Sequence, residues 1–326
     1  MMNKKIFFTL LLISGLLSNV KVGTAVYRWA EIETGARAIG MAGSQVASGN
    51  GVYAIPYNPA NLGFIDSDTE VYVSKSSYLA GSSHNTMAFG MAMSSSDYFG
   101  VHLYYFDSGI MQETTEIEGG PTGQTFKFTG LLTRLTYAKQ LTDRLKIGTN
   151  FKYFLEKTTS ADLSMSSWAI DIGSNFDTGI YGMTLGMCIS NLGPDARYAG
   201  TGLDVQGEDD QQKKTEYFPI PLTFRVGIMN DIMGASDDAL FENPTHRVTS
   251  SIDFVNPLDY KLTPNLGVEY SFDEMIFVRA GSHMGHDTAG LTFGFGLSYN
   301  NINLDFGWAD YAILESTWQL GLSFGF

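Results

Sequence analysis

The chain ends in the segment TWQLGLSFGF, residues 317–326, in which large apolar side chains occupy every second position. The apolar set consists of Trp318, Leu320, Leu322, Phe324 and Phe326, and small or polar residues stand between them. A period of two is typical of a β-strand whose two faces meet different surroundings. The segments LTFRVGI at 222–228 and NINLDFGW at 301–308 repeat the pattern. The chain is therefore predicted to be all-β.

Segments with this alternation recur from Thr69 to the C-terminus, and counting them predicts about fourteen strands of roughly ten residues each. A tilted strand of about ten residues is long enough to cross a bilayer. The expected spans are 69–78, 85–95, 97–106, 124–137, 144–156, 165–176, 181–191, 219–231, 246–255, 262–272, 275–283, 290–299, 301–308 and 317–326.

The connections between the expected strands alternate in length, as they do in outer-membrane barrels with short inner turns and long outer loops. Connections after even-numbered strands are short, whereas those after odd-numbered strands include the long segments 107–123 and 192–218. One inner connection, IMGASDDALFENPT at 232–245, is too long for this rule. A misplaced strand or a small helix would explain it.

The alternative fold is a soluble β-sandwich or propeller, whose second strand face would be rich in charged residues. Here the second face is dominated by Gly, Ser, Thr and Asn, and only 17% of all residues are charged. The sequence therefore predicts a transmembrane antiparallel β-barrel over residues 69–326, with membrane lipid around it.

The N-terminus carries the pattern of a secretory signal peptide, predicted over residues 1–25. Lys4 and Lys5 precede an apolar run from Ile6 to Leu17, and small residues follow at 23–25. A membrane anchor is the alternative. We expect export to the bacterial outer membrane with cleavage of this segment.

The net charge of −14, which becomes −17 without the three lysines of this segment, argues against nucleic acid as a partner.

Residues 26–68 show no strand alternation and include IPYNPANLG at 55–63, whose two prolines cannot donate to a sheet. A fourteen-stranded barrel is too wide for its own side chains to fill. Irregular backbone is tolerated at membrane depth only where protein or water surrounds it. We therefore expect residues 26–68 to form a plug, or hatch, inside the barrel, held against the wall by Asn58 and Pro59.

If the apolar face meets lipid, ionisable side chains on the other face point into the lumen. Their mixed signs indicate paired charges rather than a ring that selects one kind of ion. Alternatively, each is a salt-bridged wall residue with no role of its own. The candidates are Arg134, Lys152, Asp171, Arg225, Asp253, Glu269, Arg279 and Asp305, together with His102 and Lys146.

The stretch GARAIGMAGSQVASGNGVYAIPYNPANLGF, residues 35–64, resembles the N-terminal signature of PorV/PorQ proteins, which belong with the FadL-like transporters. The matching positions include Gly35 to Ala38 and Tyr57 to Leu62. An acidic pair usual in that signature is replaced here by residues 49–51. The segments YAKQLTDRLKIGTNFKY, ISNLGP, PIPLTFRVGI and FVRAGSHMGHDTAGLTFGFGL are also similar to that family.

The resemblance implies a fourteen-stranded outer-membrane barrel with an N-terminal hatch and one of two functions. The first is a part in type IX protein secretion, with a translocon and cargo C-terminal domains as partners. The alternative is a FadL-like channel for hydrophobic small molecules. It also implies a terminal Phe326 read by the barrel assembly machinery. The hatch residues singled out by the motif are Arg37, Tyr57, Asn58, Pro59 and Ala60.

Motifs for catalysis or cofactors are weak, so we expect no enzyme, no cofactor and no metal site. Residues 321–325 match G-x-S-x-G, but that motif needs a strand-to-helix turn and here lies in an expected strand. His283, His286 and Asp287 have no further ligand cluster nearby in sequence, which favours surface loop residues over a metal site.

Overall fold

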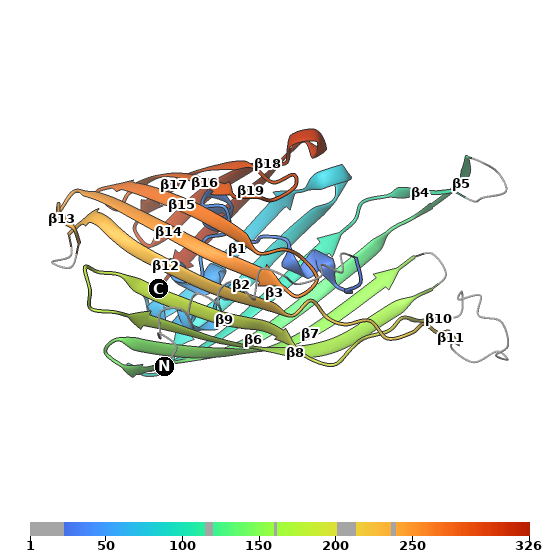
Figure 1. Cartoon of the computed structure of the whole chain (residues 1–326), viewed down its shortest axis with the longest axis horizontal. Helices are drawn as coiled ribbons and strands as arrows, with labels where there is room; N and C mark the ends of the chain where they lie inside the picture. The colour runs from blue at the N-terminus through green and yellow to red at the C-terminus, as the bar shows by residue number, and fades with distance from the viewer. Residues whose placement is uncertain (1–22, 115–119, 160–161, 201–212, 236–238) are drawn as a thin grey trace, which may run out of the picture.

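The computed structural model describes residues 23–114, 120–159, 162–200, 213–235 and 239–326, and it is a closed antiparallel β-barrel (Figure 1). Residues 1–22, which hold most of the expected signal peptide, lie outside the described residues. No helix in the described part of the chain is both long and apolar enough to cross a membrane.

Fourteen strands form the wall, each antiparallel to its neighbours, and β1 pairs with β19 to close it. This confirms the predicted fold class and strand number. In order around the barrel the strands are β1 (Thr69–Ser77), β2 (Ser83–Ala92), β3 (Asp97–Asp107), β6 (Phe128–Thr142), β7 (Leu145–Thr158), β8 (Ser164–Asp177), β9 (Thr184–Leu192), β12 (Thr223–Gly234), β14 (His246–Pro257), β15 (Thr263–Phe272), β16 (Ile276–His283), β17 (Leu291–Tyr299), β18 (Ile302–Asp310) and β19 (Ser316–Gly325).

Five shorter strands lie in the described parts of the connections. A separate hairpin of β4 (Met111–Thr114) and β5 (Pro121–Phe126) occupies part of a segment expected to be loop, so β6 begins at Phe128 and not at 124. The other three are β10 (Ala199–Gly200), β11 (Lys213–Lys214) and β13 (Phe241–Glu242).

Two predicted boundaries around β12 are wrong for identifiable reasons. The strand starts at Thr223 and not at 219, because Pro219 and Pro221 have no backbone N–H for the sheet. It then continues to Gly234, and β13 adds a parallel bridge beside its end. The long inner connection is therefore partly strand, and its described residues contain no helix.

The two ends of the barrel differ. The turn end carries the connections 93–96, 143–144, 178–183, 235–245, 273–275 and 300–301, all of them short except 235–245. The loop end carries 78–82, 108–127, 159–163, 193–222, 258–262, 284–290 and 311–315. β13 marks the turn end in Figure 1, and the β4–β5 hairpin and β10–β11 mark the loop end.

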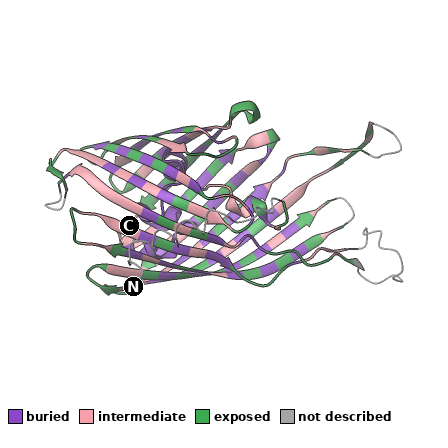
Figure 2. Cartoon of the chain, viewed as in Figure 1, coloured by how far each residue is buried: buried purple, intermediate pink, exposed green. Residues whose placement is uncertain are grey.

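Alternation along each strand separates an apolar outer face from a buried inner face, seen as stripes in Figure 2. In β17, Phe293 and Phe295 are 51% and 45% exposed, whereas Thr292, on the other face of the same strand, is fully buried. An exposed belt of aromatic and aliphatic side chains would be unfavourable in water and suits contact with lipid.

Residues 26–68, here called the N-terminal segment, lie along the inner face of the wall (Figure 1). Its short helices are η2 (Arg28–Glu31), α2 (Ala36–Gly40), η3 (Val52–Ala54) and η4 (Pro59–Phe64). Helix α2 packs on β17 and β18, and η4 packs on β6, β7 and β8. Two further 3₁₀ turns, η5 (Leu79–Gly81) and η6 (Ala312–Leu314), lie in loop-end connections.

Glycines on the inner face allow the N-terminal segment to approach the wall backbone. Among the described residues, five pairs of glycines stand opposite each other on neighbouring strands, and a β-carbon on any of the ten would come within 3.0 Å of the segment. The pairs are Gly90–Gly100, Gly148–Gly173, Gly186–Gly227, Gly267–Gly281 and Gly294–Gly307.

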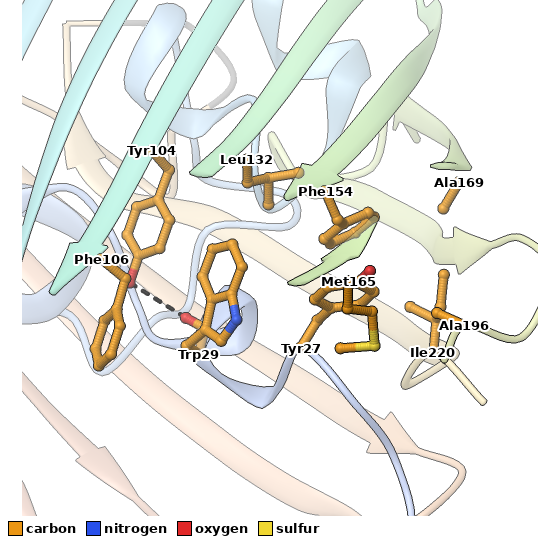
Figure 3. Packing of buried hydrophobic residues seen from close by; sticks show 10 residues of the cluster. All are labelled: Tyr27, Trp29, Tyr104, Phe106, Leu132, Phe154, Met165, Ala169, Ala196 and Ile220. Atoms are coloured by element: carbon orange, nitrogen blue, oxygen red, sulfur yellow. Dashed lines mark hydrogen bonds between the residues drawn. The ribbon is translucent and has the colours of Figure 1, made fainter. Parts of the chain in front are cut away.

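An aromatic cluster anchors the start of the segment near the loop end (Figure 3). The Trp29 ring stacks on Tyr104 with centroids 5.9 Å apart, and Tyr104 donates a hydrogen bond to the Trp29 carbonyl. Trp29 Nε1 also donates to Glu156 Oε2 at 2.6 Å. Tyr27 stacks on Phe154 at 4.8 Å. Burial of these large rings holds the segment at this end of the barrel.

Replacing Gly307 by alanine tests the close approach. A β-carbon there would lie 2.4 Å from the Ala36 carbonyl oxygen, and a backbone atom cannot move aside cheaply. Such overpacking costs about 1–3 kcal/mol. We expect Gly307→Ala to lower the temperature at which the folded band is lost on semi-native gels and to raise conductance in planar bilayers. Gly290→Ala is the control, because its nearest atom would be 3.9 Å away. Equal behaviour of both variants would contradict the argument.

Candidate functional site

Asn58 joins three parts of the molecule. Its Oδ1 accepts a hydrogen bond from the Ala60 N–H and so caps η4, which begins at Pro59. Its Nδ2 donates to the Val46 carbonyl at 2.8 Å and to the Ser174 carbonyl of β8 at 2.9 Å. A proline at the first helical position and an asparagine cap are the residues that a short helix favours at its start.

Neighbouring polar side chains repeat this kind of contact. The Tyr57 hydroxyl donates to the Thr34 carbonyl and accepts from the Thr34 N–H. Asn61 Nδ2 donates to the Gln45 carbonyl, and Asn175 of β8 donates to Asn61 Oδ1 at 3.0 Å. Buried backbone groups of the segment therefore find partners without strand pairing.

Arg37 is the centre of a buried charge cluster. Its guanidinium donates to both Glu269 oxygens, with Nε–Oε2 at 2.8 Å and Nη2–Oε1 at 3.1 Å. Arg279 Nε donates to the same carboxylate at 2.6 Å, and Arg279 Nη1 donates to Asp305. Nη1 of Arg37 also donates to Gln45 and to the Ser48 carbonyl. The cluster ties the segment to β15, β16 and β18.

A second cluster lies on β3, β6, β7 and β8. Lys152 Nζ and Asp171 Oδ2 form an ion pair at 2.8 Å, and Asp171 also accepts from Asn150 and the Asn191 N–H. Arg134 Nη1 contacts His102 Nδ1 at 3.0 Å. The structure therefore places most of the candidate charges in two separate groups and not in one ring.

The remaining candidates have individual partners. Asp253 Oδ2 accepts from the Val46 N–H at 2.8 Å, and Arg225 Nη1 donates to Ser190. Lys146 lies over the Phe64 ring at 3.3 Å. Phe326 extends beyond β19 with its backbone paired to Thr69 and 60% of its surface exposed.

Two cavities lie on opposite sides of the N-terminal segment. The turn-end cavity, of about 530 Å³, is bordered by Arg37, Glu70, Glu269 and Arg279. The loop-end cavity, of about 320 Å³, is bordered by Glu33, Tyr57, Arg134 and Arg225. Both volumes lie in or near the range of about 300–1,000 Å³ usual for small-molecule sites.

Sequence reasoning about His283 was wrong, because the residue is not on the surface. Only 7% of its side chain is exposed, and its Nε2 lies 3.7 Å from Glu33 Oε2 inside the loop-end cavity. No group of three or more metal-ligating side chains occurs among the described residues. Ser323 lies within β19, paired on both sides, so the strand-to-helix turn of a nucleophile elbow is not present there.

Sequence reasoning missed Glu33, Trp29 and Glu156. Glu33 precedes the recognised motif and carries no pattern of its own. Burial raises its pKa to about 8, and nearby Arg225 partly offsets the effect. Trp29 lies in no recognised motif, and its partner Glu156 is 127 positions away in the sequence. The inward glycines were the available signal, because glycine at alternate strand positions marks close backbone approach.

Solved structures with the same fold include the Pseudomonas putida toluene transporter TodX, at 12% identity, covering 90% of this chain and 98% of that chain with a TM-score of 0.62. The CymD monoaromatic hydrocarbon channel matches at 14% identity, 90% and 96% coverage and a TM-score of 0.58. A Pseudomonas aeruginosa FadL homologue matches at 12% identity, covering 90% of this chain and 98% of that chain with a TM-score of 0.55. No protein-family model and no curated protein matches the chain.

At these identities the comparisons establish the fold. The chain has the architecture of FadL-type barrels, which is the wider of the two groups that the sequence resemblance implied. They do not single out PorV/PorQ proteins within that architecture.

Removing the Asn58 contacts tests the hold of η4 on the wall. Asn58→Ala with Pro59→Ala deletes the cap, worth about 1 kcal/mol, and both hydrogen bonds from Nδ2. We expect higher bilayer conductance and greater leakage of large antibiotics into cells. Ser94→Ala, on an exposed turn-end connection, is the control. Unchanged permeability in a correctly folded double variant would reduce the motif to a turn.

Glu33 gives a pH-dependent stability with a defined sign. Its pKa is about 8 in the folded chain against 4.5 for a free side chain, so the protonated form stabilises the fold. That contribution is complete below about pH 4.5 and is lost as the pH rises through about 8. The titratable and charged groups around Glu33 include Arg225, His283, Tyr57, Tyr78 and Tyr311.

We expect Glu33→Gln to flatten the loss of unfolding free energy between pH 5 and pH 8, measured by urea unfolding in lipid vesicles. Glu216→Gln, at an exposed loop position, serves as the control. The assignment fails if the two variants lose stability with pH in the same way as the parent chain.

Proposed function

We propose that the chain is an outer-membrane channel for small hydrophobic molecules. The observation that carries this proposal is the closed fourteen-stranded barrel with residues 26–68 inside it, a fold shared with TodX and CymD. Those two proteins are described as a toluene transporter and a monoaromatic hydrocarbon channel. The apolar outer belt and the signal-like N-terminus support a place in the outer membrane.

The sequence alone favoured a part in type IX secretion and kept the hydrophobic channel as the alternative. The solved structures that share the fold support the alternative, because none of those compared above is described as a secretion component. Recognition of Phe326 by the barrel assembly machinery remains part of the proposal, and its exposed position at the end of β19 is compatible with it.

In this proposal the N-terminal segment is the barrier that a solute must pass. Its residues 34–49 are almost entirely buried, and it separates the two cavities. Passage along the lumen therefore requires that the segment shifts. Ser44 Oγ in the segment and Ser251 Oγ in β14 lie 2.8 Å apart, which offers a position for a reversible covalent lock.

Uptake in whole cells tests the function. We expect a strain lacking its own hydrocarbon channels to take up labelled toluene several times faster when it expresses the chain than when it expresses an unrelated porin. A triple variant combines Ser44→Cys and Ser251→Cys with Cys188→Ser. In this variant, oxidation to the disulfide should abolish the gain in uptake, and a reductant should restore it. The Cys188→Ser chain alone is the matched control. A folded barrel in the outer membrane that gives no gain contradicts the proposed function, and a gain that survives oxidation contradicts movement of the segment.

A further inference from the structure

The loop-end cavity carries an excess of positive charge. Its lining includes Arg28, Arg134, Lys152 and Arg225 but only two carboxyl groups, those of Glu31 and Glu33. The whole chain has a net charge of −14, so a cationic interior site is unusual within it. The turn-end cavity has the opposite balance, with three arginines and six carboxyl groups in its lining.

Two of the four cations are already neutralised by carboxylates. Arg28 forms ion pairs with Glu31 and Asp259, and Lys152 forms one with Asp171. Arg134 and Arg225 form no ion pair within the described residues. Arg134 is buried and Arg225 is partly buried. A cation that is removed from water without an ion pair is costly, which marks a position where an anionic ligand would be stabilising.

Arg134 is the more telling of the two. Arg134 is 3% exposed, and its Nη1 lies 3.0 Å from His102 Nδ1. Its Nε has no hydrogen-bond partner within the described residues. Arg225 donates only to the Ser190 hydroxyl in the described structure. Guanidinium groups bind carboxylates through paired N–H donors, which makes arginine suited to this recognition.

Glu33 does not cancel these charges. Burial raises its pKa to about 8, so its carboxyl group is mainly protonated at neutral pH. A protonated carboxyl group is also a hydrogen-bond donor to an incoming anion. His283 faces this carboxyl group, with its Nε2 3.7 Å from Glu33 Oε2.

Aromatic rings form much of the rest of the cavity. Tyr57, Tyr78, Tyr260 and Tyr311 line it, and the Tyr78 and Tyr311 rings meet edge to face with centroids 5.9 Å apart. Tyr78, Tyr260 and Tyr311 belong to loop-end connections, so the cavity borders that end of the barrel. Flat apolar walls of this kind favour a ring, and the volume of about 320 Å³ restricts the ligand to a compact one.

We propose that the loop-end cavity binds a compact aromatic carboxylate, with its anionic oxygens held by Arg134 and Arg225 and its ring among the tyrosines. This site goes beyond the proposed passage of neutral hydrocarbons. It is a statement about binding, so it stands or falls independently of any flux through the barrel.

Calorimetric titration of benzoate into the full chain in non-ionic detergent tests the site. We expect saturable binding that is about tenfold or more tighter than that of benzamide, which has the same shape without the charge. Acetate, which keeps the charge without the ring, and dodecanoate, which exceeds the cavity, should both bind more weakly than benzoate. Failure of benzoate to bind, or equal binding of benzamide, overturns the proposal, and acetate or dodecanoate binding as tightly overturns the compact aromatic class.

Variants locate the site. Arg225→Gln and Arg134→Gln should each weaken benzoate binding about tenfold, because each removes a charge-assisted contact. Arg144→Gln removes an exposed arginine at the turn end and should leave binding unchanged. Migration on semi-native gels verifies the fold of each variant. Full affinity in folded Arg134→Gln and Arg225→Gln chains overturns the assignment; if either variant does not fold, the comparison of benzoate with benzamide on the parent chain decides it.

Discussion

The contact of one backbone with another, the N-terminal segment against the inner wall, is the constraint on which the rest of the lumen depends. A β-carbon on Gly148 would lie 2.4 Å from the Pro59 carbonyl carbon, and one on Gly186 would lie 2.3 Å from the Val46 oxygen. At such distances water is excluded, so the polar groups of an irregular chain need partners from the protein. Side chains of the wall supply them: Asp253 accepts the Val46 N–H, and Asn175 donates to the Ala47 carbonyl.

The buried charges follow from the same constraint. Glu269 accepts from Arg37 in the segment and from Arg279 and Arg247 in the wall, so one carboxylate sets the position of three guanidinium groups. Such pairs add little net stability, because desolvation offsets most of their attraction. Loss of one partner is costly, however, since it leaves an unpaired charge. The cluster therefore favours one position of the segment in the barrel over others. Displacement of the segment would leave charged groups that only water or a polar ligand can pair.

The sequence could predict the wall because alternation is a local property. Each strand shows its two faces within about ten residues, and the fourteen spans depend on little else. The lumen could be predicted less well, because its contacts join distant residues: Arg37 and Glu269 are 232 positions apart. Pro219 illustrates the limit at a boundary, since apolar residues around it continue the pattern while the missing N–H ends the pairing. His283 illustrates it at a site, since a histidine at a strand end has no local signal for pointing inward.

The opposite charge balance of the two cavities makes the two ends of the lumen electrostatically different. Cations prevail on the loop side of the segment and carboxyl groups prevail on the turn side. An anion that enters from the loop end would be attracted as far as Arg134 and Arg225 and then repelled by the carboxylates of the turn-end cavity, Glu274 among them. A neutral solute meets no such barrier and depends only on the movement of the segment. If both proposals hold, electrostatics would retain an anionic molecule at the segment while neutral molecules pass, and one barrel would combine binding of the first class with conduction of the second.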